Sequence, residues 1–254
     1  LWIFSGDYKA KYNQIMSSKL MIASIVFYCL HVIGMLWTED VQWGLHVLHK
    51  MWYFLLFLPI LFNIVQRKYI NYYLSAFLLA IALTEIASYL VWFEIIPPFE
   101  KATVANPTPF MSHISYNPIL TFAIYLVLHE IFFNKKLTNL VFSFYSFFAI
   151  SMTINMFITG GRAGQVAFFV MLSILIFQIF DKQRIKSLLV ILIIIPLIFF
   201  SAYQTSDIFH TRVNQAVNDT MNFDELVKIK KQYTSVALRI NYAINSWEVI
   251  KKNP

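Results

Sequence analysis

Long apolar runs separated by short polar segments recur along most of the chain. A bilayer core about 30 Å thick needs roughly 20 mostly apolar residues in a helix that rises about 1.5 Å per residue. The pattern therefore predicts an all-α, polytopic bundle with about seven transmembrane helices. The expected spans are residues 20–37, 50–65, 73–93, 118–133, 138–158, 165–180 and 187–203.

The part of the chain after the last span is polar. Within it, residues 236–250 carry apolar side chains at helical spacing, which predicts an amphipathic helix. We therefore divide the chain into a transmembrane helical region, 1–203, and a loop segment, 204–254, that is truncated at its C-terminal end. Because the chain begins at Leu1 rather than Met and ends in mid-pattern, we expect a fragment of a longer protein.

Composition supports a membrane protein over a soluble one. Hydrophobic residues make up 59% and charged residues 13% of the chain, whereas soluble domains have about 45–50% and about 25%. The single cysteine, Cys29, excludes an intrachain disulfide and a cysteine-based metal site.

The basic residues between the runs predict how the chain is oriented. Alternate connecting segments are rich in Lys and Arg, and the positive-inside rule places those segments in the cytoplasm. They hold Lys9, Lys11, Lys19, Arg67, Lys68, Lys135, Lys136, Lys182, Arg184 and Lys186, while the opposite side's short loops hold only Lys50, Lys101 and Arg162. Residues 204–254 then lie on the outer side. The net charge of +7 is explained by orientation in the bilayer, so no nucleic-acid partner is expected.

Arg162 is the first candidate binding residue. It follows Gly160 and Gly161 in a tight outer turn just before a span that we expect to start near Gly164. Glycines let the backbone turn sharply and let a ligand approach closely, and a helix N-terminus favours a phosphate. The pattern favours a diphosphate site, and the alternative is an arginine that reaches lipid headgroups.

Arg239 lies on the predicted amphipathic helix, eight positions before Trp247. Taken alone, it is typical of a solvated or headgroup-contacting charge. Together with Arg162 on the same outer face, it could hold a diphosphate by bidentate contacts that Lys does not make.

His113, Tyr116 and Asn117 stand where an outer loop enters the fourth span. An imidazole there could act as acid, base or phosphate donor, and the two neighbours could donate hydrogen bonds to a sugar or phosphate. A histidine that only orders the loop is an equally good interpretation.

Glu85, midway along the third span, is the deepest acidic residue. An intramembrane carboxylate is a candidate for a proton or cation pathway, but a structural hydrogen bond to a neighbouring helix is the interpretation that we favour. The chain has no phosphate-binding Gly-Lys-Ser/Thr loop, no His-Glu-x-x-His pattern and no nucleophile elbow. No metal and no cofactor are therefore expected.

Three segments resemble the O-antigen ligase and polymerase superfamily of bacterial inner-membrane glycosyltransferases. They are Ile158–Gln165 with the arginine turn, Arg239–Pro254 with Arg, Trp and Asn-Pro in order, and Ser112–Tyr116 with a His-Ile pair. The resemblance implies a metal-independent transferase that moves a glycan from undecaprenyl diphosphate to an acceptor such as lipid A core, at the periplasmic face. It also implies that Arg162 and Arg239 hold the diphosphate.

The family's proposed catalytic histidine would lie beyond Pro254, so the catalytic residue is unknown here and the fragment is expected to be inactive. We place a ligase ahead of a polymerase because the outer segment after residue 203 is sizeable. Two other classes stay open: a secondary transporter or flippase that uses Glu85, and a non-catalytic assembly subunit in contact with membrane lipids.

Overall fold

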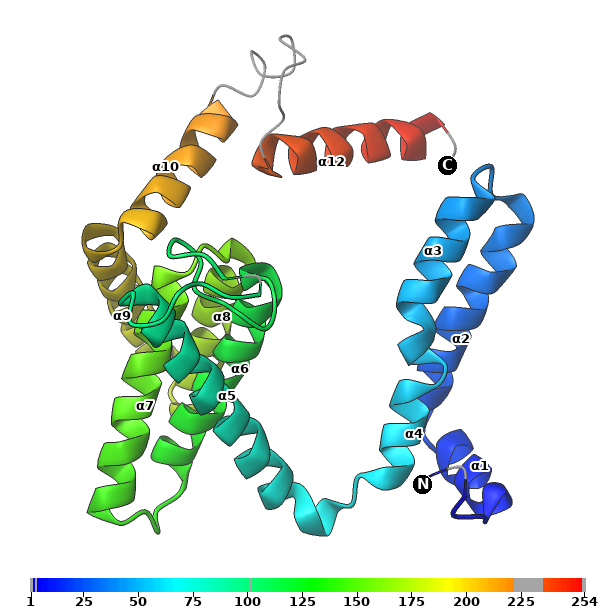
Figure 1. Ribbon diagram of the computed structural model, residues 1–254, viewed down its shortest axis with the longest axis horizontal. Helices are drawn as coiled ribbons and strands as arrows, with labels where there is room; N and C mark the ends of the chain where they lie inside the picture. Colours follow the sequence, from blue (N-terminus) through cyan, green and yellow to red (C-terminus); the bar gives the residue numbers. More distant parts are fainter. Residues whose placement is uncertain (1, 3, 101, 222–234, 253–254) are drawn as a thin grey trace. The chain divides into compact units, whose positions relative to one another are not determined.

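The structure, a computed structural model, describes residues 2, 4–100, 102–221 and 235–252. Helices dominate these residues, and the only pairing of the β type among them is an isolated bridge between Thr103 and Asn106. Seven of the described helical segments are long and apolar enough to cross a membrane, which confirms the predicted fold class. They are α2 (Lys19–Gly34) with its 3₁₀ extension, α3 (Val41–Met51) with α4 (Phe57–Ile64), α5 (Ile70–Trp92), α6 (His113–Phe133), α7 (Asn139–Ile158), α8 (Arg162–Ile179) and α9 (Arg184–Thr205) (Figure 1).

Three further helices among the described residues flank these spans. They are α1 (Tyr8–Ser17) before the first span, and α10 (Asp207–Met221) and α12 (Ser235–Lys252) after the last. The helix predicted over 236–250 is therefore confirmed as α12. Residues 222–234, 253 and 254 of the predicted loop segment lie outside the described residues.

The chain divides into two compact units, Leu1–Phe77 and Leu78–Pro254. In the first unit, α2 begins where the Ser18 side chain accepts a hydrogen bond from the Met21 amide, and α3 begins where Asp40 accepts one from Trp43. Because Asp40 caps α3, the second span begins at Val41 rather than at residue 50 as the hydrophobic pattern predicts. A 3₁₀ segment interrupts that span at Trp52–Phe54.

The second unit is built around α6, which packs against both α7 and α8. Its buried residues are Tyr116, Asn117, Leu120, Thr121, Ala123, Ile124 and Val127. The helix begins at His113, five residues before the predicted span start, even though it contains Pro118. A proline in the second turn removes only the bond to the carbonyl four residues earlier, and here that residue is the exposed Ile114.

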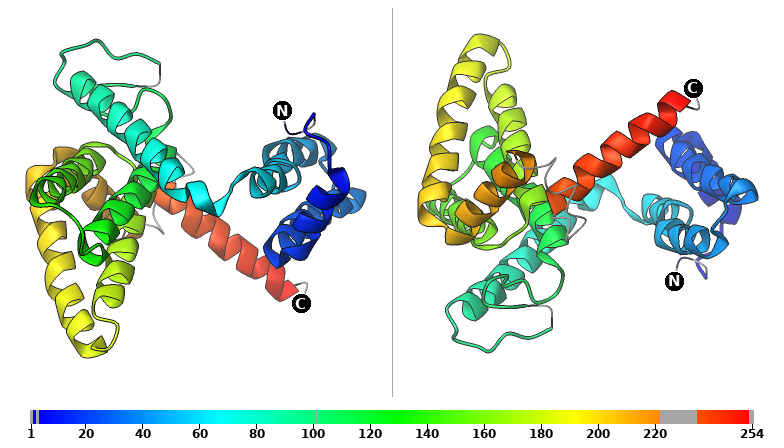
Figure 2. Two further views of the ribbon diagram at one scale, coloured as in Figure 1. Left: turned by 90° about the horizontal axis from the view of Figure 1, so that it is seen from below. Right: turned by 90° about the horizontal axis from the view of Figure 1, so that it is seen from above.

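The last span lies on the outside of this unit. Both views in Figure 2 show α9 (yellow) running along the outside of the helices that precede it. Only Ser187 and Ala202 of α9 are buried, while Leu192 and Phe200 are more than 60% exposed. Lipid tails would cover such a surface at no cost, since a helix satisfies its own backbone hydrogen bonds. The second unit is thus a helix bundle with an apolar periphery.

One end of the second unit gathers the segments that form the candidate site. The turn between α7 and α8 lies there, and its Gly160 amide donates a hydrogen bond of 3.0 Å to Asn106 of the loop before α6. The helix α10 reaches the same end, where the Ser206 hydroxyl donates to the Phe157 carbonyl at 2.7 Å. The loop, the turn and α10 therefore meet at one end of the helices.

Candidate functional site: an arginine-lined cleft

The turn that carries Arg162 is short. The helix α7 ends at Ile158, Gly161 is the N-cap of α8, and Arg162 is the first residue of α8. The predicted start near Gly164 was two residues too late. A cation at the first position of a helix is disfavoured by the helix dipole, typically by about 0.3–1 kcal/mol, so helix stability does not explain this arginine.

The glycines of the turn allow α8 to approach α6 closely. A Cβ on Gly161 would lie 2.6 Å from the His113 carbonyl oxygen, and a Cβ on Gly164 would lie 2.8 Å from the Pro118 nitrogen. Both glycines are needed for space rather than for an unusual backbone angle, because Gly161 has φ of −81°. Gly160 has Asn106 and Arg212 as neighbours instead. Gly160 is closely packed as well, since a Cβ there would lie 2.8 Å from Asn106 Oδ1, so these glycines do not leave the room that was expected for a ligand.

Buried hydrogen bonds hold the turn in place. The Asn117 amide group donates to the carbonyl oxygens of Met156 and Gly161, both at 3.3 Å, and its Oδ1 accepts from the Thr159 hydroxyl at 2.7 Å. Gln165 donates to the Thr159 carbonyl at 3.1 Å. Asn117 and Thr159 are fully buried. Asn117 thus supports the turn from within and is not available to a sugar or phosphate.

A cleft of about 150 Å³ opens above this turn. It is lined by His113, Ile114, Gly160, Arg162, Ala163, Arg212 and Arg239. Four of the residues singled out in the sequence, Gly160, Arg162, Arg239 and His113, therefore meet in one place. Drug-sized ligands occupy pockets of about 300–1,000 Å³, so this cleft is sized for a compact group rather than a whole glycan.

Arg212 is a third arginine that sequence reasoning missed. It projects from α10, which is anchored by Phe209, whose ring centroid lies 5.1 Å from that of Phe157 and 5.3 Å from that of Phe199. Gln215, one turn further along, accepts hydrogen bonds from both Arg162 and Arg212, each at 3.4 Å. The spacing of Phe209, Arg212 and Gln215, three positions apart, was the signal in the sequence for a helix at α10. Nothing in the local sequence indicated which part of the protein the polar face of that helix contacts.

The cleft is strongly positive. Arg212 and Arg239 both act electrostatically on Arg162, and the one described acidic residue that does so is Asp219, which is 7% exposed. Among the described residues, none of the three guanidinium groups forms a salt bridge, and the buried Arg162 Nη1 has no hydrogen-bond partner. Three converging cations beside a helix N-terminus favour a multivalent anion.

Tyr116, another candidate, does not line the cleft. It is 3% exposed and lies next to Thr84 and Glu85 of α5. Its position one residue before Asn117, on a different side of α6, separates it from the arginines. Its proposed contact with the substrate finds no support in this arrangement.

Glu85 also lies away from the arginines. Its carboxylate accepts a hydrogen bond of 2.5 Å from Ser151 of α7, and one turn along α5 the Ser88 hydroxyl accepts from Asn155. Two polar pairs thus join α5 to α7, as expected for helices that meet inside a membrane. The partner of Glu85 is on another helix, not Thr84 or Ser88 of its own. No group of three or more His, Cys, Asp or Glu side chains able to hold a metal ion occurs among the described residues.

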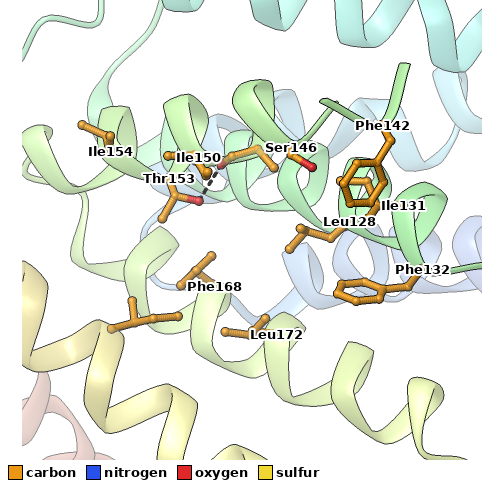
Figure 3. Close-up of a pocket in the computed structure, with 12 residues that line it drawn as sticks. Leu128, Ile131, Phe132, Phe142, Ser146, Ile150, Thr153, Ile154, Phe168 and Leu172 are labelled. Carbon is orange, nitrogen blue, oxygen red and sulfur yellow. Dashed lines mark hydrogen bonds between the residues drawn. The ribbon is translucent and has the colours of Figure 1, made fainter. Parts of the chain in front are cut away.

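Two apolar crevices lie along α7. The first, of about 560 Å³, is lined by side chains of α6, α7, α8 and α9, including Leu128, Ile150 and Leu172 (Figure 3). The second, of about 540 Å³, shares Ile154 and Ile198 with the first and extends to Ile158 and Ser206. The crevices adjoin, and the second ends next to the turn that carries Arg162. Their apolar lining suits a hydrocarbon chain.

The comparisons cover the part of the chain that contributes all three arginines. No curated protein and no solved structure matches this chain. Residues 147–254 match the family model described as O-antigen ligase. This match confirms, for residues 147–254, the resemblance predicted from the motifs, in a chain whose seven long apolar helices indicate a multi-pass membrane protein.

Proposed function

We propose that this protein transfers a glycan from undecaprenyl diphosphate to an acceptor sugar, such as lipid A core, at the periplasmic face of the bacterial inner membrane. The observation that carries the proposal is the meeting of Arg162 and Arg239 in one small cleft. These arginines come from elements far apart in the sequence, and no described carboxylate pairs with either of them. The family match supports glycan transfer of this type.

In this proposal the two guanidinium groups bind the diphosphate of the lipid donor. Charge-assisted hydrogen bonds to phosphate oxygens hold the donor and stabilise the diphosphate as it leaves the sugar. His113, at the cleft wall, adds a donor to a phosphate oxygen. The hydrocarbon tail of the donor lies in the apolar crevices along α7, the second of which ends next to the turn that carries Arg162.

Arginine variants of the full-length protein test the proposal in a strain that lacks the gene and receives each variant. Arg162→Ala and Arg239→Ala are each expected to abolish attachment of the surface polysaccharide while membrane insertion stays normal. Lysine at either position is expected to restore little, because an ammonium does not make the paired contacts of a guanidinium. Arg184→Gln, which removes an exposed arginine at the start of α9, is the control with the same loss of charge and is expected to retain transfer.

The gel pattern of lipopolysaccharide separates a ligase from a polymerase. Long banded chains vanish from the surface in both cases, but core capped with a single repeat persists only when a polymerase is missing. Normal attachment in both alanine variants would exclude glycan transfer at this cleft.

A further inference from the structure

Three guanidinium groups line the cleft, whereas a diphosphate diester carries two negative charges. Arg212 lines it together with Arg162 and Arg239. Arg212 and Arg162 both donate to the same oxygen of Gln215, so the two groups lie close together although they repel each other. Gln215 is neutral and cancels none of this charge. Both bonds, at 3.4 Å, are longer than the usual range of about 2.7–3.2 Å, which leaves the guanidinium groups free to turn toward a stronger acceptor.

The helix α10 holds Arg212 in this position through contacts that do not involve the cleft. The Phe209 ring packs on α7 and α9, and Ser206 is hydrogen-bonded to the end of α7. On the next turn, Asn214 accepts a hydrogen bond of 2.8 Å from Tyr203. The backbone that carries Arg212 is thus fixed before any ligand binds, as expected of a preorganised electrostatic site.

The charge of the proposed substrate changes during the proposed reaction. A lipid diphosphate that carries a sugar is a diester with two negative charges. The acceptor oxygen forms a bond to the sugar's anomeric carbon, the electron pair of the breaking carbon–oxygen bond goes to the diphosphate, and the acceptor's proton is released to water. The diphosphate leaves as a monoester with a third negative charge, since the last ionisation of a phosphate monoester has a pKa near 6.

We propose that Arg212 binds this third charge and acts mainly on the departing diphosphate rather than on the intact donor. The inference rests on the function proposed above. Arg162 and Arg239 match the two charges of the donor, and Arg212 supplies the further cation at the moment when the further charge appears. An interaction that is stronger in the transition state than in the ground state raises the rate, whereas equal interaction with both does not.

Binding to two lipids tests the proposal on the purified protein in nanodiscs. The probes are undecaprenyl diphosphate, which represents the departing group, and undecaprenyl diphosphate that carries one N-acetylglucosamine, which represents the donor. Arg212→Gln is expected to weaken the first complex by about ten- to one-hundredfold, the equivalent of one charge-assisted hydrogen bond, and the second by much less. Arg162→Gln and Arg239→Gln are expected to weaken both, and Arg184→Gln neither.

Arg212→Lys is a second variant for the case in which Arg212→Gln fails to fold. It keeps the positive charge and loses only the planar guanidinium group with its paired donors. It is expected to retain the preference for the departing group in weakened form. Equal weakening of both complexes by Arg212→Gln, or no weakening of either, would overturn the role of Arg212. Failure of the proposed function looks different: the unaltered protein would bind neither lipid, or the Arg162 and Arg239 variants would bind both as well as it does.

Discussion

Gly164→Ala tests whether the close contact between α6 and α8 positions Arg162. An added Cβ would lie 2.5 Å from the Asn117 carbonyl carbon and 2.8 Å from the Pro118 nitrogen. Ordinary contacts between such atoms are about 3.5–4.0 Å, so the helices must separate by about 1 Å. The obstructing atoms are the Asn117 Cβ, which is nearest, and backbone atoms of α6, and no side-chain rotation can move any of them away.

The added Cβ destabilises the contact between α6 and α8 in two ways. Overpacking of this kind costs about 1–3 kcal/mol. Separation also strains the hydrogen bond of 2.9 Å from Thr121 to the Gly164 carbonyl, which is worth about another 1 kcal/mol. The free energy of unfolding is therefore expected to fall by about 2–4 kcal/mol. A displacement of about 1 Å in a positioned group lowers the rate by roughly one-hundredfold, so transfer should fall far more than the amount of protein in the membrane.

The assay compares Gly164→Ala with Gly34→Ala. A Cβ on Gly34 would meet nothing within 4 Å, and alanine is favoured over glycine in a helix by about 1 kcal/mol, so Gly34→Ala should be neutral or mildly stabilising. Each variant is measured for thermal melting of the purified protein and for lipopolysaccharide attachment at matched membrane levels. Equal melting and equal attachment in the two variants would refute the reasoning.

Two further variants address the rest of the second unit. Glu85→Gln should leave glycan transfer unchanged and stability within about 1 kcal/mol, because a glutamine oxygen still accepts the Ser151 hydrogen bond; loss of function with intact folding would instead favour the transporter interpretation. Ile198→Trp should narrow both apolar crevices and raise the KM for lipid donors severalfold, with little change in binding of inorganic diphosphate at the cleft. An unchanged KM would remove the crevices from the path of the donor's tail.

The sequence was most informative where local rules suffice. The number and the approximate places of the spans follow from the length of each apolar run, because a helix must satisfy its own backbone across the bilayer. The observed span boundaries differ from the predicted ones where a single capping residue or proline determines them. The second span begins early because Asp40 caps α3, and α6 begins before Pro118 and continues through it. The sequence also placed Arg162 among the candidates, because it follows two glycines in a turn, and Arg239, because it lies on an amphipathic helix predicted on the same outer side.

Only the tertiary structure decided which of these residues share a site. Arg212 lines the cleft, whereas Tyr116 is buried away from it. Which residues line the cleft depends on how α6 and α10 are rotated against α8. Helical periodicity determines which residues share a face of one helix, but it does not determine which faces meet. That choice was made here by the small Gly161 and Gly164, by the buried hydrogen bonds of Asn117 and by the aromatic anchor Phe209. The sequence by itself therefore determined a membrane bundle with two conspicuous arginines, and packing between helices turned them into one cleft with a third.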